Sequence, residues 1–232
     1  MPIDNSAAIR NLLHFEISGD VYYVQVMQRG KDPGNSRDKI IKDYHIHDFE
    51  QFDRTLPEIK EMCEKYYARA MIRLNQRNTM DANIVAQINA LHNQLEINRV
   101  LRKMVRTGKA DLGLPRIPSI QHLYSSALGT TCTEDGDTKK WIIDIDPDMV
   151  DASTPGFDTI YAIADTFMKY IVAECGKKDG VPKEYCRLPS KHGLHLVTST
   201  FRMDKFNTHF GKPGNQNDYV MVDANTNLYI PD

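Results

Sequence analysis

Two aspartates, Asp144 and Asp146, stand two residues apart in the short apolar segment WIIDID. This segment has the composition of a β-strand, in which side chains at positions i and i+2 share a face. The two carboxylates therefore project together, while Trp141, Ile143 and Ile145 point to the opposite, packed side. Two carboxylates on one face indicate a metal site. Without further support, the same pattern more often marks an exposed strand edge or a calcium-like loop.

Two later strand-like segments supply that support. The segment SKHGLHL contains Ser190, Lys191 and His195, and the segment YVMVD ends on Asp223. A hydroxyl, an ammonium group and an imidazole can all donate hydrogen bonds to phosphate oxygens. An isolated histidine is more often structural, and His192 competes with His195 although it falls on the other strand face. Taken in order, the three segments combine carboxylates with side chains that can bind phosphate, which is stronger evidence than one short motif.

Such a constellation suits chemistry on a nucleoside triphosphate. In nucleotidyl transfer a 3′-hydroxyl attacks the α-phosphate, and divalent ions bridge the nucleophile and the leaving group. Carboxylate oxygens suit Mg²⁺ or Mn²⁺. We therefore expect Asp144, Asp146 and Asp223 to bind the metal. Asp148 is a further candidate, for which a role in a turn or cap is the preferred interpretation.

The elements that must position these residues form a pattern of their own. After the WIIDID strand, we predict a helix that begins at Pro155 and has an apolar face from Phe157 to Ile171. Strands at 184–188 and 194–201, a short helix at 203–210 and a strand at 219–223 follow. The order β-α-β-β-α-β is the ferredoxin-like arrangement, in which helices cover one face of the sheet. The three aspartates and His195 would meet on the open face.

The first half of the chain predicts a sheet with helices packed on it. We expect a hairpin at 12–29, strands at 39–46 and 70–74, and a helix from the capping pattern TLPE at Thr55 to Ala68. A long helix follows, capped by Asp81, and its apolar line is Ile84, Ile88, Leu91 and Leu95.

The Gly- and Pro-rich segment TGKADLGLPRIP then marks a boundary. The fold class is therefore α+β. The boundary separates an N-terminal α/β lobe at 1–118 from a ferredoxin-like module at 119–232.

Candidate nucleic-acid contacts are less distinctive. Arg73, Asn75 and Arg77 alternate in the segment MIRLNQR, so on a strand they would share a face and contact template or nucleotide. An ordinary polar outer face is an equal alternative, and the same two interpretations apply to Arg29 and Lys31.

A second basic group lies on the long helix. Arg99, Arg102 and Arg106 follow one another at helical spacing and could track a phosphate backbone. A solvated helix face is the commoner reason for such a stripe.

The composition of the chain excludes several other classes of protein. The 232 residues are 41% hydrophobic, which supports a substantial core, and the net charge of −2 argues against a surface that binds polyanions throughout. Four cysteines without a CxxC pair favour neither a zinc knuckle nor a disulfide framework. Because we find neither a secretory pattern nor an apolar run of roughly 18 residues, we expect a cytoplasmic protein without membrane contact.

Taken together, the motifs around Asp144 to Asp146, Ser190 to His195 and Asp223 resemble the three signature motifs of the archaeo-eukaryotic primase superfamily. The segment PSKHGLH and the ending NLYIP are similar to primase-polymerase domains of phages and plasmids. The resemblance covers residues 139–232, is only architectural over 1–118, and implies that the N-terminal α/β lobe packs on a C-terminal RRM-like palm module at 119–232 to form one catalytic domain. It implies primer synthesis or extension in DNA replication, with the three aspartates on metal and Ser190, Lys191 and His195 on nucleotide phosphates.

The resemblance also implies a DNA template and nucleoside triphosphates as partners. No P-loop motif is present, so a replicative helicase would be a separate protein. Two alternatives stay open: a non-catalytic module that binds nucleotides or nucleic acid on the same fold, and a metal-dependent phosphohydrolase.

Overall fold

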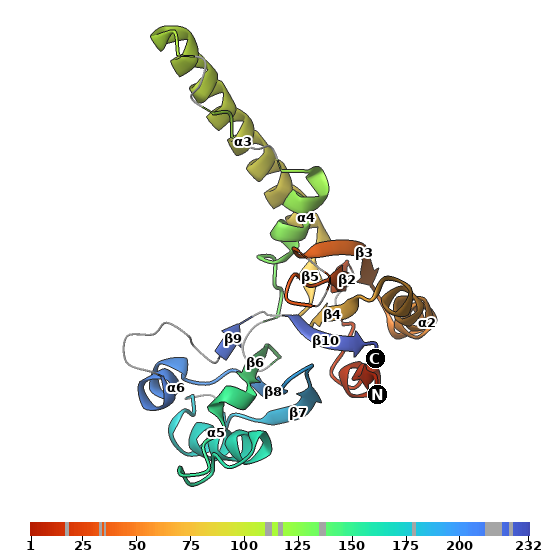
Figure 1. Cartoon of the computed structure of the whole chain (residues 1–232), viewed down its shortest axis with the longest axis vertical. Helices are drawn as coiled ribbons and strands as arrows, with labels where there is room; N and C mark the ends of the chain where they lie inside the picture. Colours follow the sequence, from red (N-terminus) through yellow and green to blue (C-terminus); the bar gives the residue numbers. More distant parts are fainter. Residues whose placement is uncertain are drawn as a thin grey trace. The chain divides into compact units, whose positions relative to one another are not determined.

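The computed structural model describes residues 1–16, 19–32, 34, 36–109, 113–115, 118–134, 138–177, 180–211, 220–222 and 225–232. The chain forms two compact units (Figure 1). Unit 1 consists of Met1–Gln76 and Glu134–Asp232, and unit 2 is the segment Arg77–Thr133 between them. The predicted boundary at residue 118 falls within the range of unit 2. The division into lobes 1–118 and 119–232 therefore stays a prediction.

Unit 1 contains a sheet that joins the two ends of the chain. Its strand order is β1-β10-β4-β2-β3, and the neighbouring strands along this path are antiparallel. The strands are β1 (Ile3–Asp4), β10 (Asn225–Ile230), β4 (Arg69–Arg73), β2 (Asp20–Gln28) and β3 (Lys39–Ile46). The predicted strands at 39–46 and 70–74 are thereby confirmed. The predicted hairpin is wrong, because residues 12–16 form no strand and Leu13 instead packs into the core.

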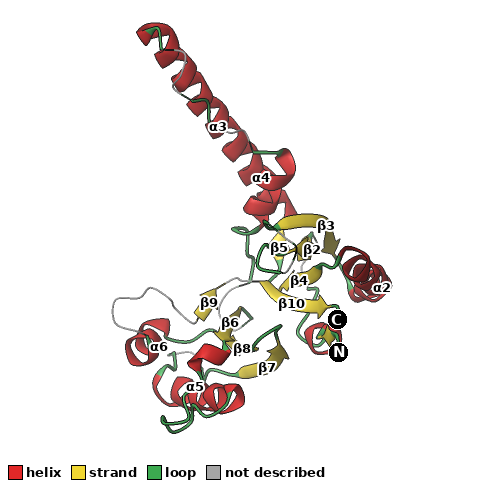
Figure 2. Cartoon of the chain, in the orientation of Figure 1, coloured by secondary structure: helices red, strands yellow, loops and turns green. Residues whose placement is uncertain are grey.

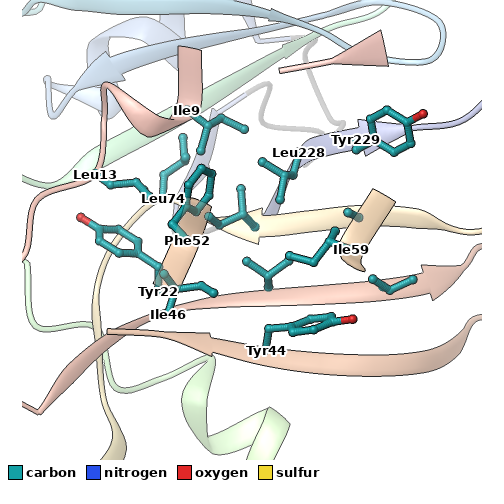
Figure 3. Close-up of a cluster of buried hydrophobic side chains, with 14 of the residues drawn as sticks. Ile9, Leu13, Tyr22, Tyr44, Ile46, Phe52, Ile59, Leu74, Leu228 and Tyr229 are labelled. Carbon is teal, nitrogen blue, oxygen red and sulfur yellow. The ribbon is translucent and has the colours of Figure 1, made fainter. Parts of the chain in front are cut away.

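Helices α1 (Ser6–Arg10) and α2 (Phe49–Tyr66) pack against this sheet. Ile9 of α1 and Phe52 of α2 are buried against Tyr22 and Leu228 of the strands (Figure 3). The same core takes in Ile142, Leu188 and Val197, which belong to the second sheet of unit 1. Burial of this apolar surface is the main force that holds the unit together.

Helix α2 begins earlier than the sequence predicts. Asp48 is its N-cap, and its side chain accepts a hydrogen bond from Gln51 N at 2.6 Å. The predicted start at Thr55 is wrong, and Pro57 lies inside the helix. The first turns are stabilised because Phe52, near the start of the helix, is buried in the core, which outweighs the backbone hydrogen bond that proline cannot donate.

The second sheet of unit 1 has the strand order β7-β8-β6-β9, again with antiparallel neighbours. Its strands are β6 (Lys140–Ile145), β7 (Glu184–Pro189), β8 (Leu194–Ser199) and β9 (Val220–Val222). Helix α5 (Ile160–Glu174) follows β6, and α6 (Met203–Phe210) precedes β9 (Figure 2). Helix α5 is capped by Thr159, so the predicted start at Pro155 is wrong. Asp151 instead accepts hydrogen bonds from Ser153 and Thr154 in a local turn.

Alternation along β6 separates the packed side from the side that carries the aspartates. Ile143 and Ile145 are fully buried, and they form a core with Phe167 of α5 and Phe206 of α6. Asp144 therefore points away from the two helices, as predicted. The mixed α+β class predicted from the sequence is confirmed.

Unit 2 is built on the long helix α3 (Thr79–Thr107), with the short strand β5 (Arg77–Asn78) before it and α4 (Ile120–Leu128) after it. Asn78 caps α3 by accepting a hydrogen bond from Asp81 N at 2.9 Å, so the predicted cap at Asp81 is wrong by three residues.

The predicted packing of the apolar line of α3 is also wrong, because all four residues are 50–63% exposed. A helix of 29 residues is about 43 Å long, which exceeds the reach of a small core. Within the described part of the chain, no helix combines the length and apolar character that crossing a bilayer requires.

Candidate functional site

A pocket of about 480 Å³ in unit 1 brings together five of the residues predicted to carry chemistry. Both carboxylates of the WIIDID segment, Asp144 and Asp146, line it, as do Ser190, Lys191 and His195. These residues come from the end of β6, from the turn between β7 and β8, and from β8. The antiparallel pairing of β6 with β8 brings together residues that lie about fifty positions apart in the sequence.

Asp144 and His195 face each other across that pairing. They are direct partners in the register, and His195 Nε2 lies 3.3 Å from Asp144 Oδ1. The other ring nitrogen, Nδ1, lies 2.8 Å from the hydroxyl of Thr226 on β10. With its proton on Nε2, the buried ring donates to Asp144 and accepts from Thr226. The imidazole is therefore fixed in orientation, and it limits where the Asp144 carboxylate can lie.

Asp146 follows β6 and comes directly before the 3-10 turn Pro147–Met149. Burial raises the pKa of its carboxyl, and the nearby negative charges of Asp144 and Asp148 raise it further. His195 and Lys31 act in the opposite direction. This carboxyl thus lies in a site where negative charge is already concentrated, and a bound cation would relieve that repulsion.

The turn that carries Ser190 and Lys191 is closed by its own hydrogen bonds. Ser190 N donates to Gly193 O, and Gly193 N donates to Ser190 Oγ, both at 3.0 Å. The Ser190 hydroxyl accepts this bond and keeps its own hydrogen for another acceptor. A Cβ at Gly193 would lie 2.2 Å from Ile145 O, so glycine is required by the close approach of β6. Glycine is therefore needed here to avoid a clash with β6, and a bound ligand is not required to explain it.

Lys191 is bound by Asp32, a residue that the sequence did not single out. Lys191 Nζ donates to Asp32 Oδ1 at 2.7 Å, and Arg69 Nε donates to Asp32 Oδ2 at 2.8 Å. Arg69 Nη2 also contacts Asp32 Oδ1, so the guanidinium binds the carboxylate with two nitrogens. Burial alone would raise the pKa of Asp32, but the hydrogen bonds from Arg69 and Lys191 hold it below its ordinary value.

Further residues complete the lining of the pocket. Arg29 and Lys31, whose role was left open, line it together with Asp32 and Arg69. Asn225 and Asn227 of β10 also line it. Their only sequence signal was a common face at positions i and i+2 of a short strand. The pocket thus gathers four cationic side chains, Arg29, Lys31, Arg69 and Lys191, around three carboxylates.

The third predicted metal ligand, Asp223, lies outside the described residues. Over the part of the chain that is described, no group of three histidine, cysteine or acidic side chains forms a metal site. The donor set that is present, the carboxylates of Asp144 and Asp146 in one pocket, has the oxygen chemistry that Mg²⁺ and Mn²⁺ prefer.

The alternating strand face predicted for Arg73, Asn75 and Arg77 is wrong, because β4 ends at Arg73. Asn75 is buried, and its side chain accepts from Lys140 N at 2.7 Å and donates to Lys140 O at 2.9 Å. Arg77 is fully buried, and its Nη1 contacts Gly129 O at 3.4 Å. Both side chains therefore make structural contacts, and their assignment to nucleic acid stays a prediction.

The arginines of α3 lie on the surface of unit 2. Arg99, Arg102 and Arg106 are exposed, and Arg99 forms an ion pair with Glu96 one helical turn away.

Comparison of the chain with known protein families, with curated proteins and with solved structures finds no match in any of the three.

Proposed function

We propose that this chain is a metal-dependent, template-directed nucleotidyltransferase, the catalytic core of a primase-polymerase that synthesises or extends primers in DNA replication. The observation that carries the proposal is one pocket in which Asp144 and Asp146 lie among the side chains of Arg29, Lys31, Arg69 and Lys191. A ligand for this pocket must suit carboxylates and cations together, of which Arg69 and Lys191 already share Asp32. A nucleoside triphosphate with divalent ions does so, because the metal binds the carboxylates and the phosphates bind the cations.

Each group has a role in that chemistry. Asp144 and Asp146, with Asp223, would hold Mg²⁺ or Mn²⁺, which supplies the charge that stabilises the reacting phosphate. His195 orients Asp144 through Nε2, and it would reach a phosphate oxygen only by redirecting that proton from Asp144 to the ligand. Ser190 and Lys191 present a hydroxyl and an ammonium group from the adjacent turn.

The arrangement of the second sheet supports the finer fold proposal. Its elements follow the order β-α-β-β-α-β, and the strand order β7-β8-β6-β9 puts the first and third strands of the module in the middle. This is the order of a ferredoxin-like or RRM-like module. We propose it as the palm of the enzyme, with the sheet of β1, β10, β4, β2 and β3 as its companion lobe.

The partners of the reaction follow from the same proposal. They are a DNA template and nucleoside triphosphates in the cytoplasm, with any replicative helicase supplied as a separate protein. The exposed Arg99, Arg102 and Arg106 of α3 are the proposed contacts to the phosphates of the template. Arg73, Asn75 and Arg77 carry less of the proposal, because Asn75 and Arg77 are buried.

Product analysis tests the proposal against its two alternatives. The purified chain is incubated with Mn²⁺, a labelled primer-template and the four nucleoside triphosphates, in deoxy and ribo forms, with and without the primer. We expect strand extension with one pyrophosphate released for each nucleotide added. Release of phosphate or free nucleotide without extension would indicate a phosphohydrolase. Template binding without turnover would indicate a non-catalytic module.

A further inference from the structure

Two neutral carboxamides lie in the pocket among the charged side chains. Asn225 and Asn227 stand at positions i and i+2 of β10, so both side chains lie on one face of the strand. Both line the pocket with Asp144 and Asp146. In the described part of the chain, the side-chain oxygen of each is buried and has no hydrogen-bond partner.

The burial of Asn227 makes this observation informative. The residue is 4% exposed, and its main-chain oxygen is already used by the side chain of Asn5 at 2.9 Å. Buried polar atoms in folded proteins almost always have partners, because leaving one without a partner destabilises the fold. A buried carboxamide oxygen without a partner that lies beside a pocket is therefore explained most simply by a ligand that supplies the partner.

The neighbours of the carboxamides separate them from the phosphate-binding chemistry. Asn227 is the cross-strand partner of Met71 on β4, and Met71 also lines the pocket. A thioether and two neutral amides lack the positive charge with which side chains such as Arg69 and Lys191 attract phosphate. They suit an uncharged ligand group that carries both an apolar surface and hydrogen-bonding edges. A carboxamide that turns by 180° about its last bond exchanges its oxygen and nitrogen without changing shape, so it offers a ligand either an acceptor or a donor.

We propose that Asn225 and Asn227 form the subsite for the nucleoside part of the ligand, where they accept hydrogen bonds from its hydroxyl or amino donors. This proposal rests on the proposed function, which supplies the nucleoside triphosphate. It adds that the pocket recognises the sugar or base directly, in addition to the charge of the phosphates. Sugar hydroxyls and base amino groups are both sources of such donors, and the experiment below distinguishes them.

The test compares two ligands that share the phosphates and differ in the nucleoside. Binding of Mn²⁺-ATP and of Mn²⁺-tripolyphosphate is measured by calorimetry for the wild-type chain, for Asn225→Ala, for Asn227→Ala and for the exposed control Asn83→Ala. We expect each pocket variant to bind ATP about two- to tenfold more weakly, the range for one net hydrogen bond. Binding of tripolyphosphate should stay at the wild-type value, and Asn83→Ala should change neither ligand.

The other outcomes overturn one proposal or the other. Unchanged ATP binding by both pocket variants would contradict the subsite, and so would an equal loss for ATP and tripolyphosphate, because the amides would then only support the fold. A wild-type chain that binds neither ligand would instead contradict the proposed function itself.

Deoxy and dideoxy triphosphates of several bases identify the donor. A penalty that disappears with the dideoxy sugar assigns the hydroxyls, and one that persists but changes with the base assigns the amino groups. A penalty for ATP that follows neither the sugar nor the base would contradict the subsite.

Discussion

Asp32 illustrates how a single residue organises the pocket. Its carboxylate connects Arg69 of β4 with Lys191 of the turn between β7 and β8, so it joins cations from both sheets of unit 1. The side chains of Asp32 and Arg69 are only 13% and 16% exposed. Removing the carboxylate would leave a guanidinium largely buried without its counter-charge, which costs more than the loss of a surface ion pair.

We therefore predict that Asp32→Asn lowers the free energy of unfolding by about 1–3 kcal/mol at pH 7. The pKa of Asp32 is lowered in the fold, so its contribution is present above the pKa of an unfolded aspartate, about 3.9, and is lost as the pH falls through the lower folded value. Urea unfolding at several pH values measures the difference between wild type and variant, which should be full at pH 7 and shrink below about pH 4.

Asp53→Asn is the matched control, because Asp53 also binds an arginine, Arg10, through two nitrogens but lies on the surface. Its replacement should have no measurable effect on stability. Equal stability of the wild type and Asp32→Asn at every pH would show that Asp32 does not hold the two cations.

Gly193 gives a second prediction at this scale. A Cβ there would lie 2.2 Å from Ile145 O and 3.3 Å from Asp146 Cα. Gly193→Ala must therefore displace the end of β6, next to Asp146. We expect a loss of about 1–3 kcal/mol in unfolding free energy, measured by urea denaturation. Gly180→Ala is the control, because a Cβ at Gly180 meets no atom within 4 Å. A Gly193→Ala variant as stable as Gly180→Ala would contradict the close approach.

Among the elements, α2 shows why helix ends are difficult to predict. The pattern TLPE at Thr55 has the composition of a capping box, yet the helix begins at Phe49 behind Asp48. Local composition favoured the later start, and burial of Phe52 against the sheet decided for the earlier one.

We predict that Asp48→Ala lowers the unfolding free energy by about 1 kcal/mol, since its side chain satisfies the Gln51 backbone NH. Thr55→Ala, inside the helix, should cost nothing, because alanine is the better helix former. Thermal or urea unfolding followed by circular dichroism compares the two. The opposite ranking would restore the start at Thr55.

Helix α3 provides a prediction about nucleic acid. Its exposed Arg99, Arg102 and Arg106 are proposed to contact phosphates, each with release of a counterion. Replacing all three by glutamine should weaken DNA binding and reduce the slope of log K against log salt by about 2–3. Fluorescence anisotropy at several salt concentrations measures both quantities.

The control for this experiment replaces three exposed basic residues elsewhere, Lys39, Arg54 and Lys169, by glutamine. It changes the net charge equally and should leave the slope near the wild-type value. Equal slopes for the two triple variants would show that the stripe on α3 only keeps the helix solvated.

In the whole molecule, the sequence predicted the second sheet better than the first. Strands β7 and β8 and helix α6 lie within one or two residues of the predicted ranges, because their apolar patterns are short, regular and bounded by turn residues. The first sheet could not be predicted in full, because β10 joins it from the far end of the chain, and nothing local records such a pairing.

For the site, too, the sequence predicted some residues and missed others. Asp144, Asp146, Ser190, Lys191 and His195 were predicted from their motifs, and one pocket brings them together. Asp32, Arg69 and Thr226 were missed, because their importance arises only from contacts across the fold. Conversely, the apolar line of α3 looked like a packed face, since periodicity records amphipathic character and does not record what covers it.

The central claim, metal-dependent nucleotidyl transfer in the pocket of Asp144 and Asp146, is tested most directly by template-dependent incorporation with matched variants. Asp144→Asn and Asp146→Asn keep the shape of the side chains and remove the metal-binding charge, whereas Asp158→Asn makes the same change at an exposed site outside the pocket. With Mn²⁺ and a primer-template, we predict extension by the wild type and Asp158→Asn, and a loss of at least about 100-fold in both pocket variants. Wild-type rates of extension in Asp144→Asn and Asp146→Asn, with the fold intact, would contradict the account.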